Sequence, residues 1–116
     1  MAVPFYGQAT FIGAKSGTVY NKAFYASDAA GMLNLDDGSG APSATTSNFM
    51  TFQEPVYLAK LSSGAAATVK YARLIVDGAP TGWLFSFAEM LNTLARGGLD
   101  TRVGISAGKR IQLLQV

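Results

Sequence analysis

ATVKYARLIVDGAPTGWLFSF, residues 67–87, carries the strongest fold signal in the chain. Two apolar runs flank the tetrapeptide DGAP at 77–80, and Asp-Gly between such runs is the strongest short-range indication of a β-hairpin. Apolar residues mark both faces of the first run, with Val69, Tyr71 and Ile75 on one face and Ala72, Leu74 and Val76 on the other. Both faces should therefore be covered, as in a central strand or in a strand at a subunit interface.

Strand candidates continue on both sides of this hairpin, separated by turn signals every eight to twelve residues or so. They are residues 3–13, broken at Gly7, and residues 17–27, 31–38, 48–52, 54–63, 99–108 and 110–116. This spacing predicts a mainly β chain, an antiparallel β-sandwich of jelly-roll-like type with eight or nine strands. At 116 residues, the chain is expected to form a single domain, 1–116.

One segment changes to helical periodicity. In SFAEMLNTLARGG (86–98) the apolar residues recur at helical spacing, namely Phe87, Met90, Leu91, Leu94 and Ala95. Ser86 and Glu89 form a capping box, and Gly97 with Gly98 supplies a stop. These signals predict a short helix near 87–96; the alternative is a strand that runs through 83–87 into a loop.

The final segment, AGKRIQLLQV (107–116), alternates like a strand. Ile111 and Leu113 are expected to face the core, where each buried side chain contributes roughly 1.5–3 kcal/mol. The backbone of such a strand needs ladder partners. We therefore predict that removal of residues 111–116 abolishes folding.

The composition is apolar and poor in charge. Apolar residues make up 49% of the chain and charged residues 14%, against roughly 25% in an ordinary soluble domain. Small residues or partner subunits are expected to cover the remaining surface. The net charge is +2 and the longest basic cluster is Lys109-Arg110, so specific binding to nucleic acid is not expected.

The residue types limit the chemistry. The chain has no Cys and no His, which excludes disulfides, thiolate chemistry and His-containing triads. Asp36 and Asp37 are adjacent and would point to opposite faces of a strand, while Glu54 and Glu89 are isolated. We expect no enzymatic activity, no metal and no cofactor. The polar loop 36–48 is expected to connect the sheets at the surface or to contact a neighbouring subunit.

The first residues, MAVPFYGQAT, lack the basic region and apolar run of a secretory signal. No apolar stretch approaches the ~20 residues of a membrane-spanning helix. The expectation is a protein made in the cytoplasm without a signal peptide and without a membrane span.

Three short motifs in residues 54–116 resemble small β-sandwich structural proteins of bacteriophage virions. They are a V-D-G-x-P-T-G turn (76–82), an L-N-T-L segment (91–94) and a closing I-S-A-G-K-R-I-Q hairpin (105–112). An A-G-x-x-I turn before the last strand, here 107–111, is also common in oligomeric jelly rolls. The resemblance implies a structural protein localised in the virion, such as a capsid, penton or vertex, or decoration subunit.

The mechanism expected from this resemblance is self-assembly with copies of the chain and with other virion proteins. Candidate subunit-interface aromatics are Tyr6, Phe11, Phe24 and Tyr57. The alternative function is a monomeric carbohydrate-binding β-sandwich module, in which Trp83 and Tyr57 hold a glycan. In the assembly hypothesis, Trp83 instead packs in the sandwich.

Overall fold

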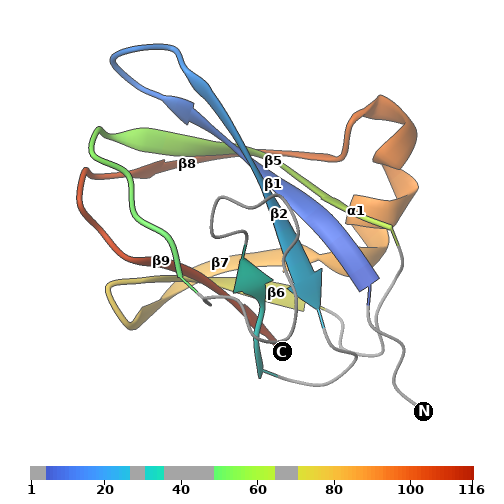
Figure 1. Ribbon diagram of the computed structural model, residues 1–116. Helices are drawn as coiled ribbons and strands as arrows, with labels where there is room; N and C mark the ends of the chain where they lie inside the picture. Colours follow the sequence, from blue (N-terminus) through green and yellow to red (C-terminus); the bar gives the residue numbers. More distant parts are fainter. Residues whose placement is uncertain (1–4, 27–30, 36–48, 65–70) are drawn as a thin grey trace.

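The computed structural model describes residues 5–26, 31–35, 49–64 and 71–116, which form two layers of antiparallel strands with a short helix at one end (Figure 1). The first layer, sheet A, has the order β4-β2-β1-β5-β8, and the second, sheet B, has the order β3-β9-β6-β7. The strands of sheet A are β1 (Phe5–Gly13), β2 (Val19–Ala26), β4 (Asn34–Leu35), β5 (Val56–Ser63) and β8 (Leu99–Ile105). Those of sheet B are β3 (Gly31–Met32), β6 (Tyr71–Val76), β7 (Ala79–Ser86) and β9 (Ile111–Gln115).

The mainly β, two-sheet architecture agrees with the sequence prediction, but the number of strands does not. Among the described residues, seven strands are full length instead of eight or nine, so the eight strands of a jelly roll are not reached. The segment 31–38 was expected to be one strand, yet β3 and β4 have two residues each and belong to different sheets. Leu33 lies between them, fully buried, where the chain crosses between layers. Of the expected strand 48–52, the described residues 49–52 contribute a bridge from Met50 to Ile111 and no strand.

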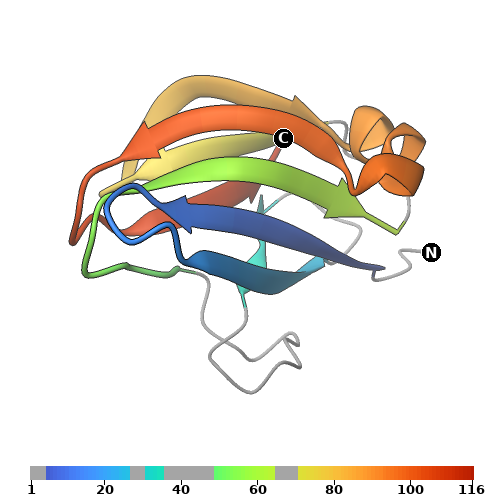
Figure 2. The same cartoon turned by 90° about the horizontal axis from the view of Figure 1, so that it is seen from above.

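The core lies between the two sheets and follows the period of two along each strand. In β8, Val103 and Ile105 are buried and Gly104 between them is exposed, as the alternation predicts. In β9, Ile111 and Leu113 are also buried, as expected. β9 pairs with β6 on one side and with β3 on the other, so the last strand lies inside its sheet (Figure 2).

β1 runs without interruption through Gly7, contrary to the predicted break. A side chain at this position would collide with the Phe24 ring and with the backbone oxygen of Ser62. Glycine is therefore required here because neighbouring strands approach closely, and it does not interrupt the strand.

The β6–β7 hairpin has the tight turn that its Asp-Gly pair predicts. Asp77 and Gly78 both have positive φ, 51° and 77°, as in a type I′ turn. The Asp77 carboxylate accepts a hydrogen bond of 2.8 Å from the Arg110 backbone N–H and pairs with Lys109 at 3.1 Å. These contacts hold the pKa of Asp77 below its usual value and tie the turn to the start of β9.

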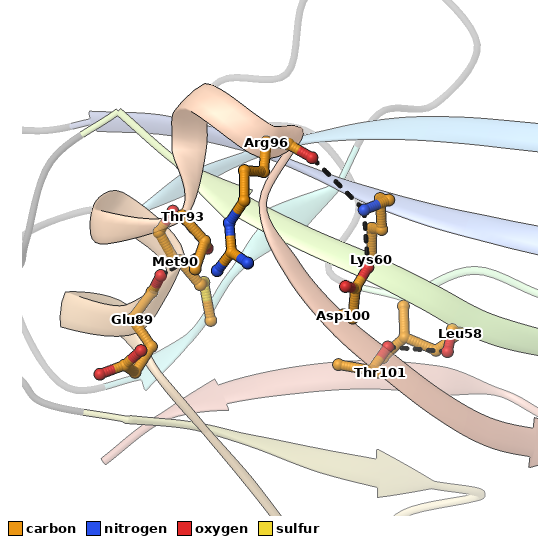
Figure 3. Close-up of polar contacts among 8 residues, drawn as sticks. All are labelled: Leu58, Lys60, Glu89, Met90, Thr93, Arg96, Asp100 and Thr101. Carbon is orange, nitrogen blue, oxygen red and sulfur yellow. Dashed lines mark hydrogen bonds and ion pairs between the residues drawn. The ribbon is translucent and has the colours of Figure 1, made fainter.

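The predicted helix is present but divided in two. α1 (Phe87–Asn92) is capped at its N-terminus by Ser86, whose hydroxyl accepts a 3.3 Å hydrogen bond from the Glu89 backbone N–H. The Thr93 hydroxyl donates to the Glu89 carbonyl at 2.6 Å, and the chain continues as a 3-10 helix, η1 (Leu94–Arg96), which ends at Gly97 in the left-handed region (Figure 3). The helical pattern therefore extends to Arg96, while the α-helix itself ends four residues earlier.

Candidate functional site

Strand irregularities in sheet A converge on one place. Along the β1–β5 pair, Thr10 lies opposite Lys60 and Phe11 lies opposite Leu58, which leaves Ala59 as an extra residue. The β5–β8 pair is also shifted between Leu58 and Lys60. Such bulges twist a strand and change the direction of its side chains, and they are common next to binding sites.

Threonine hydroxyls donate hydrogen bonds to backbone carbonyls next to one of these register shifts and next to a similar shift in sheet B. Thr101 on β8 donates to the Leu58 carbonyl at 2.7 Å (Figure 3). In sheet B, where the β6–β7 register shifts, Thr81 donates to the Leu74 carbonyl at 2.7 Å and accepts from the Trp83 backbone N–H at 3.2 Å. The backbone around Trp83 is therefore held in a fixed, bulged conformation.

An open hollow of about 730 Å³ lies over these bulges, on the outer face of sheet A. Its polar and aromatic lining residues come from four strands and are Thr10, Tyr57, Lys60, Trp83, Asp100 and Arg102. β8 and β7 are the edge strands of their sheets, and Trp83 reaches the hollow from β7. The Trp83 ring stacks on Phe85 with 6.3 Å between centroids and an angle of 13°, and 49% of the residue stays exposed.

The hollow carries three charged side chains. Lys60 donates to Asp100 at 2.6 Å and approaches the Arg96 carbonyl at 3.5 Å (Figure 3). Hydrogen bonding to the Lys60 ammonium lowers the pKa of Asp100. The Arg102 guanidinium lies 5.9 Å from the centre of the Tyr57 ring and forms no ion pair with a described residue. Arg102 is therefore the charge in the hollow that Asp100 does not balance.

The structure brings together the two residues that were predicted for ligand binding, Trp83 and Tyr57. The expectation that Trp83 packs in the sandwich is met only in part, because its ring contacts Phe85 while half of it faces solvent. Sequence reasoning missed Lys60, Asp100 and Arg102 as neighbours of the aromatic pair. The alternation in β8 places Asp100 and Arg102 outward, but no local signal indicates that Trp83 of the other sheet reaches them.

A second surface, the sheet B face, is formed by the outward side chains of sheet B. Its apolar members with solvent-accessible side chains are Met32, Tyr71, Leu84 and Leu114, whereas Ile75 on the same face is only 4% exposed. Tyr71 and Leu84 are each 43% exposed. Arg73 is the one charged residue in the described strands of this sheet, and its guanidinium donates to the Thr81 carbonyl at 3.3 Å. The face is therefore an apolar patch whose cation is tied to β7.

The candidate interface aromatics separate into two groups. Tyr6 is 57% exposed and packs edge-on against Tyr25 at 5.6 Å. Phe11 and Phe24, in contrast, are buried in the core at 1% and 0% exposure, so their proposed contact with a neighbouring subunit is wrong for this fold. The alternation along β1 explains this outcome, because Phe11 and Tyr6 lie on opposite faces of the strand. Tyr57 is half-buried and belongs to the hollow.

Glu54 is not isolated, as the sequence suggested, but connects three segments. Its carboxylate accepts hydrogen bonds from the Ser16 hydroxyl at 2.8 Å, the Ser16 backbone N–H at 3.1 Å and the Tyr20 hydroxyl at 3.0 Å. The bonds from Ser16 lower the pKa of Glu54, and the bond to Glu54 raises the pKa of Tyr20. This cluster fastens the β1–β2 turn to the segment that enters β5.

Loop 36–48, with Asp36 and Asp37, lies outside the described residues. Within the described ranges, no group of three or more acidic side chains could hold a metal ion, and no helix is long and apolar enough to cross a membrane. Comparison of the chain with protein-family models, curated proteins and solved structures gives no match.

Proposed function

We propose that the chain is a structural subunit that associates with copies of itself, in the setting that its phage-like motifs imply: a virion capsid, vertex or decoration protein. The observation that carries this proposal is the sheet B face. Apolar patches on the free surface of a soluble domain mark interaction sites, and interfaces between identical subunits are more apolar than the rest of the surface.

The charge distribution supports a second copy as the partner. Only Arg73 is charged in the described strands of sheet B, and its bond to Thr81 directs it toward β7. Covering Tyr71 and Leu84 therefore desolvates a single cation, which already donates one hydrogen bond, whereas a face with several charges would cost several kcal/mol for each buried ion. A symmetric assembly repeats such a contact at every subunit.

Light scattering on a size-exclusion column, over a range of protein concentrations, tests this proposal. A trimer, a pentamer or a larger closed assembly is expected for the wild-type chain. Leu84→Lys should weaken association at least about tenfold, because a lysine in the interface loses its hydration. Val19→Lys is the matched control: Val19 is an exposed apolar strand residue in sheet A, and this variant should assemble as the wild type does.

A clean monomer at every concentration contradicts the proposal and favours the alternative, a monomeric carbohydrate-binding module. Equal loss of assembly in Leu84→Lys and Val19→Lys contradicts the choice of the sheet B face. Circular dichroism of both variants verifies that each one folds.

A further inference from the structure

We infer that the hollow on sheet A binds a ring of an acidic saccharide, with Trp83 against the face of the sugar and Arg102 at its carboxylate. The hollow lies on the outer face of sheet A, and Trp83 reaches it from β7 of sheet B. Trp83 lies on the same side of β7 as Phe85, opposite to Leu84 of the sheet B face, so the inference does not depend on the proposed assembly.

Trp83 provides a preformed stacking surface. Its ring is held by Phe85 on one side and its backbone by Thr81, while 49% of the residue faces solvent. The face of an aromatic ring is negative, and the C–H groups of a pyranose carry a small positive charge. Because the indole is already ordered, stacking costs little conformational entropy.

Polar groups for sugar hydroxyls stand in one row across three strands. Thr10 lies opposite Lys60, and Lys60 lies opposite Asp100 in the sheet register. The carboxylate of Asp100 accepts hydrogen bonds, whereas the ammonium of Lys60 donates them. Neighbouring hydroxyls on a pyranose both donate and accept, so one ring can bond to both members of this pair.

Charge selects an acidic sugar over a neutral one. Asp100 balances Lys60 at 2.6 Å, and Arg102 is left without an ion pair among the described residues. The planar guanidinium matches a carboxylate through two parallel hydrogen bonds. The volume of about 730 Å³ is within the range of small-molecule sites, and its open shape suits a unit at the end of a longer glycan.

Trp83 is the only tryptophan in the chain, so tryptophan emission reports directly on the hollow. The wild-type protein is titrated with oligogalacturonate, with its methyl ester and with a neutral glucose oligomer of equal length. Emission should change with oligogalacturonate, and this ligand should bind about tenfold more tightly than its methyl ester, which lacks the charge.

Calorimetric titrations of variants with the acid and the ester test the proposed roles of Trp83 and Arg102. Trp83→Ala should lose binding of both the acid and the ester, whereas Arg102→Gln should bind the two equally. Phe49→Ala, which removes an exposed aromatic residue outside both the hollow and the sheet B face, is the control and should bind as the wild type does.

Three results would overturn the inference. The first is an unchanged emission with every saccharide up to about 10 mM, beyond the weakest useful affinity. The second is a preference for the acid that survives Arg102→Gln. The third is a response to a thymidine oligonucleotide with none to the saccharides, which would assign the hollow to single-stranded nucleic acid. Failure of assembly leaves all three measurements interpretable on the monomer.

Discussion

The outer faces of the two sheets differ in chemistry although the inner faces form one common core. The outer face of sheet A carries Lys60, Asp100 and Arg102 around an open hollow. The strands of sheet B carry Arg73 as the one charge among their described residues. Because side chains alternate along a strand, inner positions are constrained by packing while outer positions are free to diverge. One fold can therefore present an apolar face for subunits and a polar face for a ligand.

The edge strands beside the hollow also differ from a regular sheet. β7 and β8 end their sheets at neighbouring edges, and both are irregular. Thr81 and Thr101 each donate a 2.7 Å hydrogen bond to a backbone carbonyl next to a shift in register, namely those of Leu74 and Leu58. Bulges of this kind discourage pairing with a further strand. The hollow occupies this protected edge, whereas the sheet B face offers side chains for association.

The largest expected effect comes from removing residues 111–116, which include the whole of β9. β9 pairs with both β6 and β3, and the deletion also removes Ile111 and Leu113 from the core. The truncated chain should be unfolded by circular dichroism and should show no cooperative urea transition. Deletion of Val116 alone, which is 42% exposed, should leave that transition in place. A cooperative transition in the longer truncation would show that sheet A and the rest of the core fold without β9.

Replacing Phe24 and Tyr6 separates core from surface within sheet A. Phe24→Ala should lower the free energy of unfolding by about 3–5 kcal/mol, because it leaves a cavity at a fully buried site. Tyr6→Ala removes an exposed ring and one edge-on contact with Tyr25, so its cost should stay within about 1 kcal/mol. Urea denaturation measures both. Equal losses would mean that Tyr6 has a structural role that its exposure does not reveal.

The sequence predicted correctly those elements that depend on residues close together in the chain. The Asp77-Gly78 turn, the Ser86 cap and the alternation of Val103 and Ile105 all depend on neighbours a few residues away. The same signals missed the division of residues 31–38 between two sheets, because Leu33 is placed by packing between the layers and not by its neighbours. Periodicity predicts alternation but not which face of a strand points inward, so aromatic character alone put buried Phe11 among the interface candidates.

Two aromatic residues of the candidate site could be predicted from the sequence, but the contacts that bring its residues together could not. Trp83 and Tyr57 stood out as aromatic candidates, yet they lie in different sheets. Their meeting depends on the shift at Ala59 and on the bulge next to Thr81, which no residue pattern indicates. Lys60 and Asp100 are 40 residues apart in sequence, and only the sheet register brings them to 2.6 Å.

The smallest effects concern the carboxylates that tie down one hairpin in each sheet. Glu54 holds the β1–β2 turn through Ser16, and Asp77 holds the β6–β7 turn to Arg110. Both pKa values are lowered, from ordinary values of 4.5 and 3.8. A lowered folded-state pKa means that the stabilisation is present above the unfolded-state pKa and is lost as pH falls through the folded-state pKa.

Melting temperatures measured from pH 7 to pH 2 compare how much the Glu54 and Asp77 hydrogen bonds contribute to stability. Wild-type stability should decline below about pH 4.5, with the contribution of Glu54 lost from a higher pH than that of Asp77, because the ordinary pKa of Glu is higher. Glu54→Gln and Asp77→Asn should each make the decline shallower, and Asn still tolerates the positive φ of 51°. Identical pH profiles for the wild type and Glu54→Gln would mean that the Ser16 hydrogen bonds contribute nothing to stability, which would leave the backbone turn alone to hold the hairpin of sheet A.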